Sequence, residues 1–429
     1  MPEPQSTLFF LILMVFFGAM VWWLVVAKQV VFRVLAACLA FIPAMMFGVA
    51  AVNKYYDYYQ NWNSAIADIK TQSTPAAPQH PAHADAPVNL SSFLGRTIDR
   101  QLAAQQGFTV HIWVQGQRSG ITRSVYAYLP PQYFAPGFRT YRFPVIELLH
   151  GFPGQPQDWI TVLGVATTLQ KLVSEGKAKP AVLVMPDVNG GRGISLQCLN
   201  QVRGPQDATF LAQDLPMDIY RMLRVQRPGR AWGVAGYSEG GFCAANLGLR
   251  YASNYGYAAV LSGYFKPSNN QLNHPSRMVS PFDGNARLER LNTPADLLQS
   301  LPAGTPVPHF WLGAGSAAGH DVTNAEVFEQ LVQLRQPAVT LKVVPGGGHT
   351  MFTWRLLIMP MLEWMTPGIA SQAVQADTHA AQKAAAKARR TAKATQSPKA
   401  ARSPKATHSP KAAGKTTPPN RQHASHKPA

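Results

Sequence analysis

Residues 231–241 read Ala-Trp-Gly-Val-Ala-Gly-Tyr-Ser-Glu-Gly-Gly, and this stretch decides the fold. A short apolar run, 232–235, leads into Gly-Tyr-Ser-Glu-Gly, and residues 242–251 have the composition of a helix. A strand, a G-x-S-x-G sequence and a helix in this order predict a nucleophile elbow, a sharp turn that exposes its serine, here Ser238. Gly236 and Gly240 leave room for that turn, because a Cβ at either would collide with the neighbouring strand or helix.

Apolar runs and helical stretches alternate along the chain on both sides of this motif. Residues 108–115 and 121–129 alternate in polarity around a Gly-containing turn, which predicts an antiparallel hairpin. Continuous apolar strands separated by helices predict an α/β fold, a mostly parallel sheet with helices on both faces and sites at the carboxyl ends of its strands. The further strands are expected at 145–149, 181–185, 232–235, 258–262, 310–312 and 341–344, and the main helices at 159–175, 210–223, 242–251 and 325–334.

Composition divides the 429 residues into four parts. Residues 1–53 are almost free of charge and are expected to form a transmembrane hairpin. Residues 54–90 combine a Tyr-rich juxtamembrane segment with a Pro/Ala-rich linker that has little to bury. Residues 91–368 can bury a full core and hold the Ser238 motif. Residues 369–429 are rich in Lys, Ala and Ser-Pro, and predict a disordered tail.

Two segments of the hairpin are apolar enough to cross a bilayer. Residues 7–27 carry no charge and are too long for a signal-peptide core, and 34–52 form a second span that tolerates Pro43. Lys28 and Arg33 lie between the spans, and basic residues prefer the cytoplasmic side. The sequence predicts a two-pass protein of the cell membrane with its globular domain outside the cytoplasm. One span plus one interfacial helix is the alternative, and it would place that domain in the cytoplasm.

The tail concentrates positive charge. From residue 369 onward the chain has twelve Lys and Arg against one acid, Asp377, within a net charge of +18 for the whole chain. Ser-Pro-Lys-Ala recurs from residues 397, 403 and 409, and the composition resembles linker-histone tails. Such a segment binds polyanions by charge, so we expect an anionic polymer or headgroup as its partner and no specific nucleic acid. A tail that only solubilises the chain is the alternative.

Only one pair of cysteines is available to the globular part. Cys38 falls in the second apolar span, which leaves Cys198 and Cys243. These two could form a disulfide in an oxidising compartment or remain buried thiols, and the sequence leaves both possibilities open.

A serine hydroxyl becomes a nucleophile when a base removes its proton and a third group orients that base. His349 follows the last expected strand in a Gly-rich loop and is the expected base, with His320 as its rival. Asp321 follows the preceding strand and is the expected acid. The order Ser238, Asp321, His349 is that of the α/β-hydrolases. Glu329, on the next expected helix, is the alternative acid.

The oxyanion that develops during acyl transfer needs two backbone N–H donors. One is expected from Glu239, which follows the nucleophile, and the other from Phe152 at the end of an earlier strand. His150, in the same strand end, is expected to be structural. No nucleotide-binding loop, metal cluster or flavin fingerprint occurs in the sequence, so no cofactor and no metal are expected.

Seven short motifs occur in order along the globular part: Tyr-Ala-Tyr-Leu-Pro-Pro at 126–131, Leu-His-Gly-Phe-Pro-Gly at 149–154, Met-Pro-Asp at 185–187, Asp-Leu-Pro at 214–216, Gly-Tyr-Ser-Glu-Gly-Gly at 236–241, Leu-Ser-Gly at 261–263 and Gly-Gly-His-Thr-Met-Phe-Thr-Trp at 347–354. Through them the chain, from about residue 107 to 364, resembles the putative-esterase family of α/β-hydrolases, which includes esterase D-like enzymes and mycolyltransferases of the antigen 85 type.

The resemblance implies an α/β-hydrolase fold and hydrolysis or transfer of an acyl group through an ester on Ser238. In the mycolyltransferases the acid is a glutamate on the helix, which Glu329 resembles by position. In most relatives it is an aspartate after the strand, which Asp321 resembles. Membrane-tethered members are similar to proteins of actinobacterial cell envelopes, which implies acyl ester substrates such as lipids or glycolipids.

Three classes of function are compatible with parts of this sequence. The leading hypothesis is a membrane-anchored serine esterase or acyltransferase that acts on acyl esters of the cell envelope. The alternative is a catalytically silent α/β-hydrolase domain that serves as an envelope polyanion-binding module. The third hypothesis, a nucleic-acid-binding protein, is supported by the tail alone. The ordered Ser, Asp and His favour the first hypothesis over the second, and the two apolar spans disfavour the third.

Overall fold

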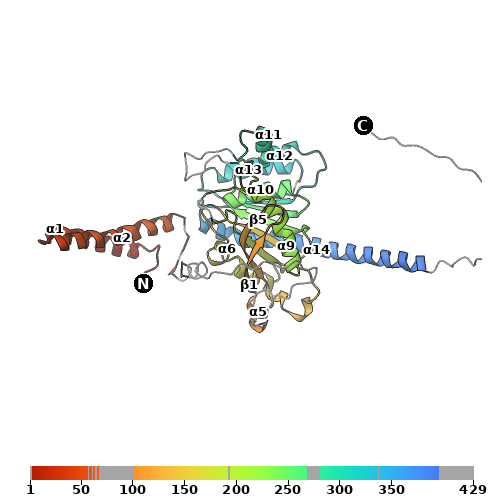
Figure 1. Ribbon diagram of the computed structural model, residues 1–429, viewed down its shortest axis with the longest axis horizontal. Coiled ribbons are helices and arrows are strands. Elements are labelled where there is room, and N and C mark those ends of the chain that lie inside the picture. Colours follow the sequence, from red (N-terminus) through yellow and green to blue (C-terminus); the bar gives the residue numbers. More distant parts are fainter. Residues whose placement is uncertain are drawn as a thin grey trace, which may run out of the picture. The chain divides into compact units, whose positions relative to one another are not determined.

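The computed structural model describes residues 2–395 except 57, 60, 63–64, 67–99, 192–193, 268–280 and 337. Contacts divide the chain into two units, Met1–Thr378 and His379–Ala429. The first unit contains an N-terminal pair of apolar helices and an α/β domain in which helices cover both faces of a sheet (Figure 1). Residues 67–90 of the predicted juxtamembrane segment and linker, and the repeats from 397 onward, lie outside the described residues.

The sheet is antiparallel at one edge and parallel through its centre. Its strands are β1 (Phe108–Gln115), β2 (Thr122–Leu129), β3 (Val145–Leu149), β4 (Val182–Pro186), β5 (Gly229–Tyr237), β6 (Tyr255–Leu261), β7 (His309–Gly315) and β8 (Thr340–Val344). Within the described residues their order is β1-β2-β4-β3-β5-β6-β7-β8. β1 pairs with β2, and β2 with β4, in antiparallel fashion, and the remaining neighbours are parallel. The predicted hairpin and the mostly parallel sheet are confirmed.

Neighbouring residues of each central strand face different cores. Val145 of β3 belongs to one buried cluster and Ile146 to the other. The first cluster is covered by α9 (Leu215–Met222), α10 (Glu239–Arg250), α12 (Pro294–Ser300) and α13 (Asp321–Gln333), and the second by α6 (Asp158–Thr161), α7 (Val165–Ser174) and the first half of α14 (Met351–Thr395). Shorter elements are α5 (Arg100–Gln106), α8 (Asp207–Thr209), α11 (Ala286–Leu291), the 3-10 turns Pro131–Tyr133 and Pro136–Phe138, and a π-helical turn, Phe210–Asp214.

Two predicted helices are subdivided. The helix expected at 159–175 is two helices, because Gly164 between α6 and α7 has a left-handed backbone with φ 64°. The helix expected at 210–223 begins with the π-helical turn Phe210–Asp214 and continues as α9. In both cases the period of apolar residues is unchanged, so the pattern alone does not show the interruption.

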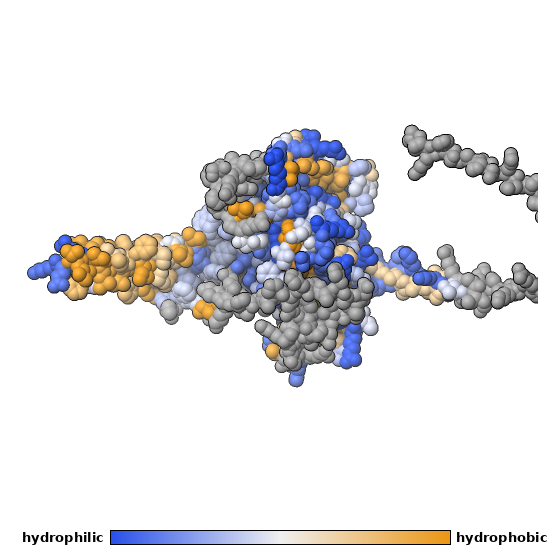
Figure 2. Space-filling view, in the orientation of Figure 1, coloured by the Kyte–Doolittle hydropathy of each residue, from blue (hydrophilic) through white to orange (hydrophobic). Residues whose placement is uncertain are grey.

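The two apolar segments form an antiparallel helical hairpin. α1 (Thr7–Val26) packs against α2 (Val30–Tyr56), and the rings of Phe10 and Phe47 lie 5.1 Å apart near one end. Most of their large apolar side chains point outward (Figure 2). Among the described residues, these are the two helices that are long and apolar enough to cross a membrane.

The juxtamembrane segment begins differently from its prediction. The sequence assigns 54–90 to a surface segment and linker, yet α2 continues through Tyr56. Tyr58 and Tyr59 then pack against the core cluster that α14 covers. The side chain of Asn53 fixes this turn, since it accepts from the Tyr59 N–H at 2.8 Å and donates to the Tyr59 carbonyl at 2.9 Å. The first residues after the hairpin therefore contact the α/β domain.

The start of the tail is placed too early by the sequence. α14 runs without interruption from Met351 to Thr395, across the predicted boundary at 368/369. Ile369 and Ala373 are fully buried, and Asp377 accepts a hydrogen bond from Gln226 at 3.0 Å. These few apolar residues are enough to hold the helix on the sheet, although the surrounding composition is that of a tail. The α/β domain therefore extends to about residue 378.

Cys198 and Cys243 form a disulfide. The bond joins the loop between β4 and α8 to α10, the helix that follows Ser238. The sequence leaves open whether these cysteines form a disulfide or remain thiols, and the structure shows the disulfide. Cys38 of α2 is an exposed free thiol.

A carboxyl group lies inside the sheet. Glu147 of β3 is fully buried, and the Tyr255 hydroxyl donates to its Oε2 at 2.8 Å. Burial raises the pKa of Glu147 to about 8, although the Tyr255 hydrogen bond opposes the shift. The folded chain thus keeps a proton on Glu147 at pH values where the unfolded chain has lost it.

The stability of Glu147→Gln relative to wild type should rise with pH from about pH 5 towards pH 8. The unfolded state releases the proton near 4.5, the ordinary pKa of a glutamate, and the folded state near 8, so wild-type stability falls through this window. The linkage is about 1.4 kcal/mol per pH unit inside the window and vanishes below it. Urea denaturation of both proteins at pH 4, 6 and 8 measures it. An equal difference at all three values would contradict a protonated Glu147.

Candidate active site

Ser238 occupies the sharp turn between β5 and α10. Its backbone has φ 55° and ψ −119°, a conformation that non-glycine residues rarely adopt, and its N–H donates to the Leu261 carbonyl at 2.9 Å. A Cβ on Gly236 would overlap the Gly240 carbonyl, and one on Gly240 would overlap the Leu149 carbonyl. The turn therefore needs both glycines, for the steric reason that the sequence suggests.

Ser238, His349 and Asp321 form a continuous chain of hydrogen bonds. His349 Nε2 lies 2.9 Å from Ser238 Oγ, and His349 Nδ1 lies 2.8 Å from Asp321 Oδ2. The imidazole is 41% exposed, whereas the carboxylate is only 14% exposed. The imidazole is therefore accessible on one side while the Asp321 carboxylate holds it on the other.

The structure distinguishes between the two candidate acids. Asp321 is the first residue of α13, directly after the loop that leaves β7, and it reaches His349. Glu329 lies eight residues further along the same helix, which corresponds to about 12 Å of helix rise. Among the described contacts of His349, the only carboxylate is that of Asp321. His320, the rival base, is the N-cap residue of α13 and has no described contact with Ser238.

Two stacked aromatic rings lie next to His349. The ring of Trp354, in the first turns of α14, meets the imidazole edge-on at 5.0 Å and stacks on Tyr237 at 4.6 Å. The Tyr237 hydroxyl donates to Asp158 Oδ2 at 3.1 Å. Tyr237 directly precedes Ser238, so a stack of two rings, Trp354 and Tyr237, connects His349 to the turn that carries Ser238.

The two residues expected to supply oxyanion donors lie beside Ser238. Glu239 is the first residue of α10, so its N–H has no acceptor inside the helix. Phe152 follows Gly151, where an added Cβ would lie only 3.1 Å from the Ser238 Cβ. The loop after β3 therefore passes directly next to the serine, and its approach requires a residue without a side chain at 151.

His150 ties two strand ends together. It is fully buried, and the Val188 N–H donates to its Nε2 at 2.9 Å. Because Nε2 accepts, the proton is on Nδ1, which lies 2.7 Å from the Gly151 carbonyl. Both ring nitrogens are engaged with backbone, as expected of a structural histidine.

The side chain of Glu239 has a role that the sequence did not reveal. It is buried, and its Oε1 accepts from the Gln197 N–H at 2.9 Å, so it joins the nucleophile elbow to the loop after β4. Burial raises the pKa of Glu239, while hydrogen bonds from Ser195 and Gln197 oppose the shift. The disulfide at Cys198 fastens the same loop to α10.

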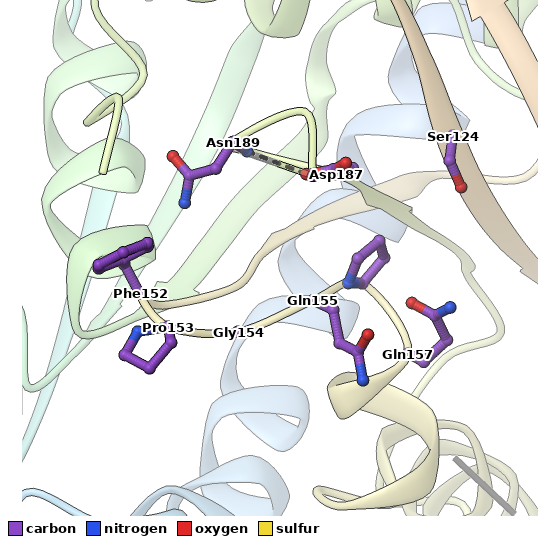
Figure 3. A pocket seen from close by; sticks show the side chains of 10 residues that line it. Ser124, Phe152, Pro153, Gly154, Gln155, Gln157, Asp187 and Asn189 are labelled. Carbon is purple, nitrogen blue, oxygen red and sulfur yellow. Dashed lines mark hydrogen bonds between the residues drawn. The ribbon is translucent and has the colours of Figure 1, made fainter. Parts of the chain in front are cut away.

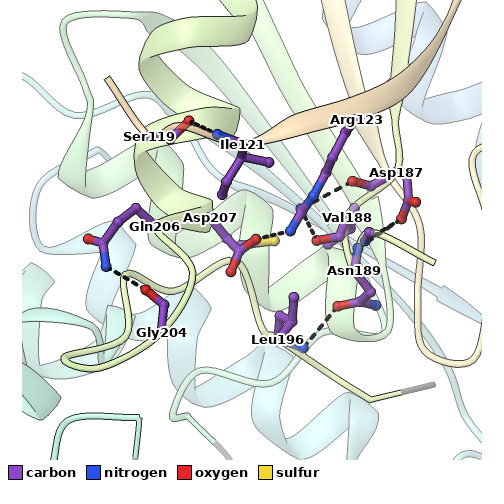
Figure 4. A network of polar contacts seen from close by, with 12 residues as sticks. Ser119, Ile121, Arg123, Asp187, Val188, Asn189, Leu196, Gly204, Gln206 and Asp207 are labelled. Atoms are coloured by element: carbon purple, nitrogen blue, oxygen red, sulfur yellow. Dashed lines mark hydrogen bonds and ion pairs between the residues drawn. The ribbon is translucent and has the colours of Figure 1, made fainter. Parts of the chain in front are cut away.

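A buried ion pair also holds the loop between β4 and α8. Arg123 of β2 pairs with Asp207, and both are nearly inaccessible (Figure 4). The same guanidinium donates to the carbonyl oxygens of Asp187 and Val188. Removing one partner of such a pair would leave an uncompensated buried charge. Neither residue belongs to a motif, and only their meeting in space identifies them.

A cavity of about 350 Å³ opens beside Phe152. Its wall combines polar side chains with prolines and comes from β2, the loop after β3 and the loop after β4 (Figure 3). Burial opposes ionisation of Asp187, but the Arg123 guanidinium and the Gly190 N–H favour the carboxylate, and the pKa of this carboxyl is lowered. The lining residues are Ser124, Phe152, Pro153, Gly154, Gln155, Pro156, Gln157, Asp187, Asn189 and Gly191.

No group of three or more His, Cys, Asp or Glu that could hold a metal ion occurs among the described residues. The expectation that the protein needs neither metal nor cofactor stays a prediction. The chemistry available at this site is that of a hydroxyl, an imidazole, a carboxylate and backbone amides.

Comparison with known proteins agrees with this geometry. Residues 116–365 match the family described as Putative esterase. The chain belongs to this esterase family. It is 25% identical over 339 residues to an uncharacterized protein of Corynebacterium glutamicum, covering 78% of this chain and 76% of that protein.

Solved structures share the fold of this esterase. A ferulic acid esterase superposes with a TM-score of 0.53 at 18% identity, covering 62% of this chain and 99% of the other. An S-formylglutathione hydrolase from Agrobacterium tumefaciens superposes with a TM-score of 0.51 at 16% identity, covering 62% and 96%. At these identities the likeness shows the α/β-hydrolase fold alone.

Gly240→Ala should lower turnover of a small ester roughly 100-fold or more, because the new Cβ displaces the elbow from the Leu149 carbonyl and misplaces Ser238. Gly137→Ala is the matched control, since a Cβ there meets nothing within 4 Å. Ester turnover and circular dichroism on both variants measure the effect. Wild-type activity in Gly240→Ala would show that the turn is not as crowded as described.

Proposed function

We propose that this esterase is a membrane-anchored serine esterase or acyltransferase that works through an acyl-enzyme, with acyl esters of the cell envelope as substrates. Ser238 is the nucleophile, His349 the general base and acid, and Asp321 the group that orients it. The backbone N–H groups of Phe152 and Glu239 form the oxyanion hole. The observation that carries the proposal is the hydrogen-bonded chain from Ser238 through His349 to Asp321.

In the first half-reaction Ser238 Oγ attacks the carbonyl carbon of the ester while His349 Nε2 takes the hydroxyl proton. The carbonyl oxygen becomes an oxyanion that accepts from Phe152 and Glu239. His349 then gives the same proton to the leaving alcohol, and the acyl group remains on Ser238. Asp321 holds Nδ1–H, so the tautomer has its lone pair on Nε2, facing the serine.

In the second half-reaction an acceptor O–H replaces the leaving alcohol. His349 removes its proton, the new oxygen attacks the acyl carbon, and Ser238 leaves with the proton that His349 returns. Water as acceptor gives a carboxylic acid, and an alcohol gives a new ester. The cavity beside Phe152 has room for a hydroxylated acceptor and polar side chains to bind it, which supports transfer as well as hydrolysis.

Two observations support a site outside the cytoplasm. Lys28 and Arg33 lie at the turn of the helical hairpin, and basic residues next to short turns favour the cytoplasmic face. The Cys198–Cys243 disulfide is typical of oxidising compartments. With two spans, both termini and the catalytic domain then lie outside the cytoplasm.

Ser238→Ala and His349→Ala should each lower kcat for short p-nitrophenyl esters on the order of a millionfold, because members of such a triad act as a unit. Asp321→Asn should be severely impaired, and Glu329→Gln, its matched control on the same helix, should be nearly normal. Steady-state kinetics with circular dichroism as a folding check measures all four. Substantial activity in Ser238→Ala, free of contaminating esterase, would refute the nucleophile.

Labelling of Ser238 by a fluorophosphonate separates the proposal from a catalytically silent module. An active serine reacts covalently, and a silent domain does not. Labelling intact cells with an impermeant probe also reports the side of the membrane. Loss of labelling in Ser238→Ala identifies the site.

Truncation after Thr378 should leave kcat/KM for a small ester unchanged and weaken binding to polyphosphate-coated beads. The removed residues, 379–429, carry twelve Lys and Arg and no acid, so binding should depend on counterion release and disappear as salt is raised. Truncation before Ile369 is the contrasting variant, because it removes buried residues. Equal binding to the beads with and without 379–429 at low salt would leave only a solubilising tail.

A further inference from the structure

Tyr58 connects the helical hairpin to the catalytic site. It stands two residues after the end of α2, and its hydroxyl lies 3.1 Å from the Pro153 carbonyl and 3.0 Å from Asp158 Oδ2. Pro153 follows the oxyanion donor Phe152. Asp158 Oδ2 also accepts from Tyr237, which precedes Ser238. A single side chain next to the hairpin thus contacts the loop after β3 and the first residue of α6, and it shares Asp158 with Tyr237 of the elbow.

The connection leaves little distance between the site and the hairpin. Two residues of extended chain span at most about 7 Å, so the end of α2 lies close to the loop after β3. Hydrogen bonds fix the turn that follows α2: the Tyr58 N–H donates to the Asn53 carbonyl at 3.2 Å, and the Asn53 side chain also binds Tyr59. If α2 crosses a bilayer, the surface of that bilayer must then lie near the mouth of the active site.

An exposed apolar stripe begins three residues after His349. Phe352, Leu356 and Met359 of α14 are 40–49% exposed, and their spacing of four and three residues places them on one side of the helix. The inward side of the same turns, including Trp354, is buried in the core. Arg355 fixes this part of α14 beside α6, since its Nε donates to the Val162 carbonyl at 3.0 Å. Asp158, to which Tyr58 binds, begins α6.

We infer that the face formed by Tyr58 and this stripe rests on the membrane that holds α1 and α2, and that the active site takes its acyl ester from that leaflet. The inference rests on the proposed function and names its substrate class, an acylated amphiphile resident in the same membrane. Apolar side chains on a helix that lies in the bilayer interface are stabilised by burial among the acyl chains. A water-facing stripe of this kind has no such stabilisation.

The arrangement also explains why the contact is made through Tyr58. A freely swinging tether would let the domain meet the membrane in any orientation. Tyr58 instead holds the loop of Phe152 and the start of α6 against the hairpin, so the mouth keeps one orientation towards the leaflet. A lipid ester can then reach Ser238 without leaving the membrane completely, which lowers the cost of removing its chains from apolar surroundings.

The first test measures the depth of the stripe in the full-length protein reconstituted in vesicles of phosphatidylcholine and phosphatidylglycerol. Leu356→Cys in a Cys38→Ser background carries an environment-sensitive fluorophore, and lipids with a quencher on the acyl chain are mixed into the vesicles. The matched control is Val327→Cys, which is 54% exposed on α13, over the other face of the sheet. We expect strong quenching at 356 and little at 327, and Tyr58→Phe should reduce the quenching at 356.

Equal quenching at the two positions would overturn the docking face. Disulfide cross-linking between two chains of the Leu356→Cys variant, with no quenching by lipid, would identify a second copy as the occupant and would also overturn it.

The second test compares two substrates. The triple variant Phe352→Ser, Leu356→Ser, Met359→Ser should hydrolyse p-nitrophenyl butyrate within about twofold of wild type, because none of the three is among the described contacts of Ser238, His349 or Asp321. It should process a long-chain fluorogenic ester in the same vesicles about tenfold more slowly. Wild type should act on that ester much faster in its own vesicles than in separate ones. Equal turnover of the embedded ester by the variant and wild type contradicts the inference. Absence of butyrate turnover in wild type contradicts the proposed function instead.

Discussion

The crowded turn at Ser238 is the constraint on which the rest of the site depends. β5 ends and α10 begins around a single residue, and carbonyl groups of Gly240 and Leu149 fill the space that side chains would need at Gly236 and Gly240. Because these Cβ atoms are absent, β3 and β5 stay paired up to Leu149, the last residue of β3, and Gly236, the last but one of β5. The loop after β3 can then pass beside the serine, which places Phe152 and Glu239 at the same corner.

Parallel strand pairing gathers groups that are far apart in the chain. Ser238, Asp321 and His349 follow β5, β7 and β8, so all three emerge at the carboxyl edge of one sheet. The histidine must still reach back past two strands. A close backbone contact permits this, since a Cβ on Gly315 would overlap the Gly347 carbonyl. The Trp354 ring, which stacks on Tyr237, meets the imidazole edge-on.

A buried polar layer holds the surroundings of the site in place. Arg123 with Asp207, Glu239 with Gln197, and His150 with Val188 all attach the loop after β4 to the strands and to α10. Each of these groups would be costly to bury alone, so the loop adopts the one arrangement in which they meet. Tyr58 attaches the hairpin to the loop after β3 and to the start of α6. The site is thus braced by the globular core and by the chain that leads to the apolar helices.

Features that depend on residues close together in the chain could be predicted from the sequence: the strands, the elbow of Ser238, the two apolar helices and the order of the three site residues. A glycine two positions from a serine, or an uninterrupted apolar run, affects the structure locally. The folded chain was needed to show that Asp321 and not Glu329 contacts His349, that Cys198 pairs with Cys243, that Ile369 belongs to the core and that Tyr58 reaches Asp158. Each of these outcomes is a contact between residues that lie on different elements. A local sequence pattern does not predict such contacts, because they depend on how whole helices and strands pack against one another.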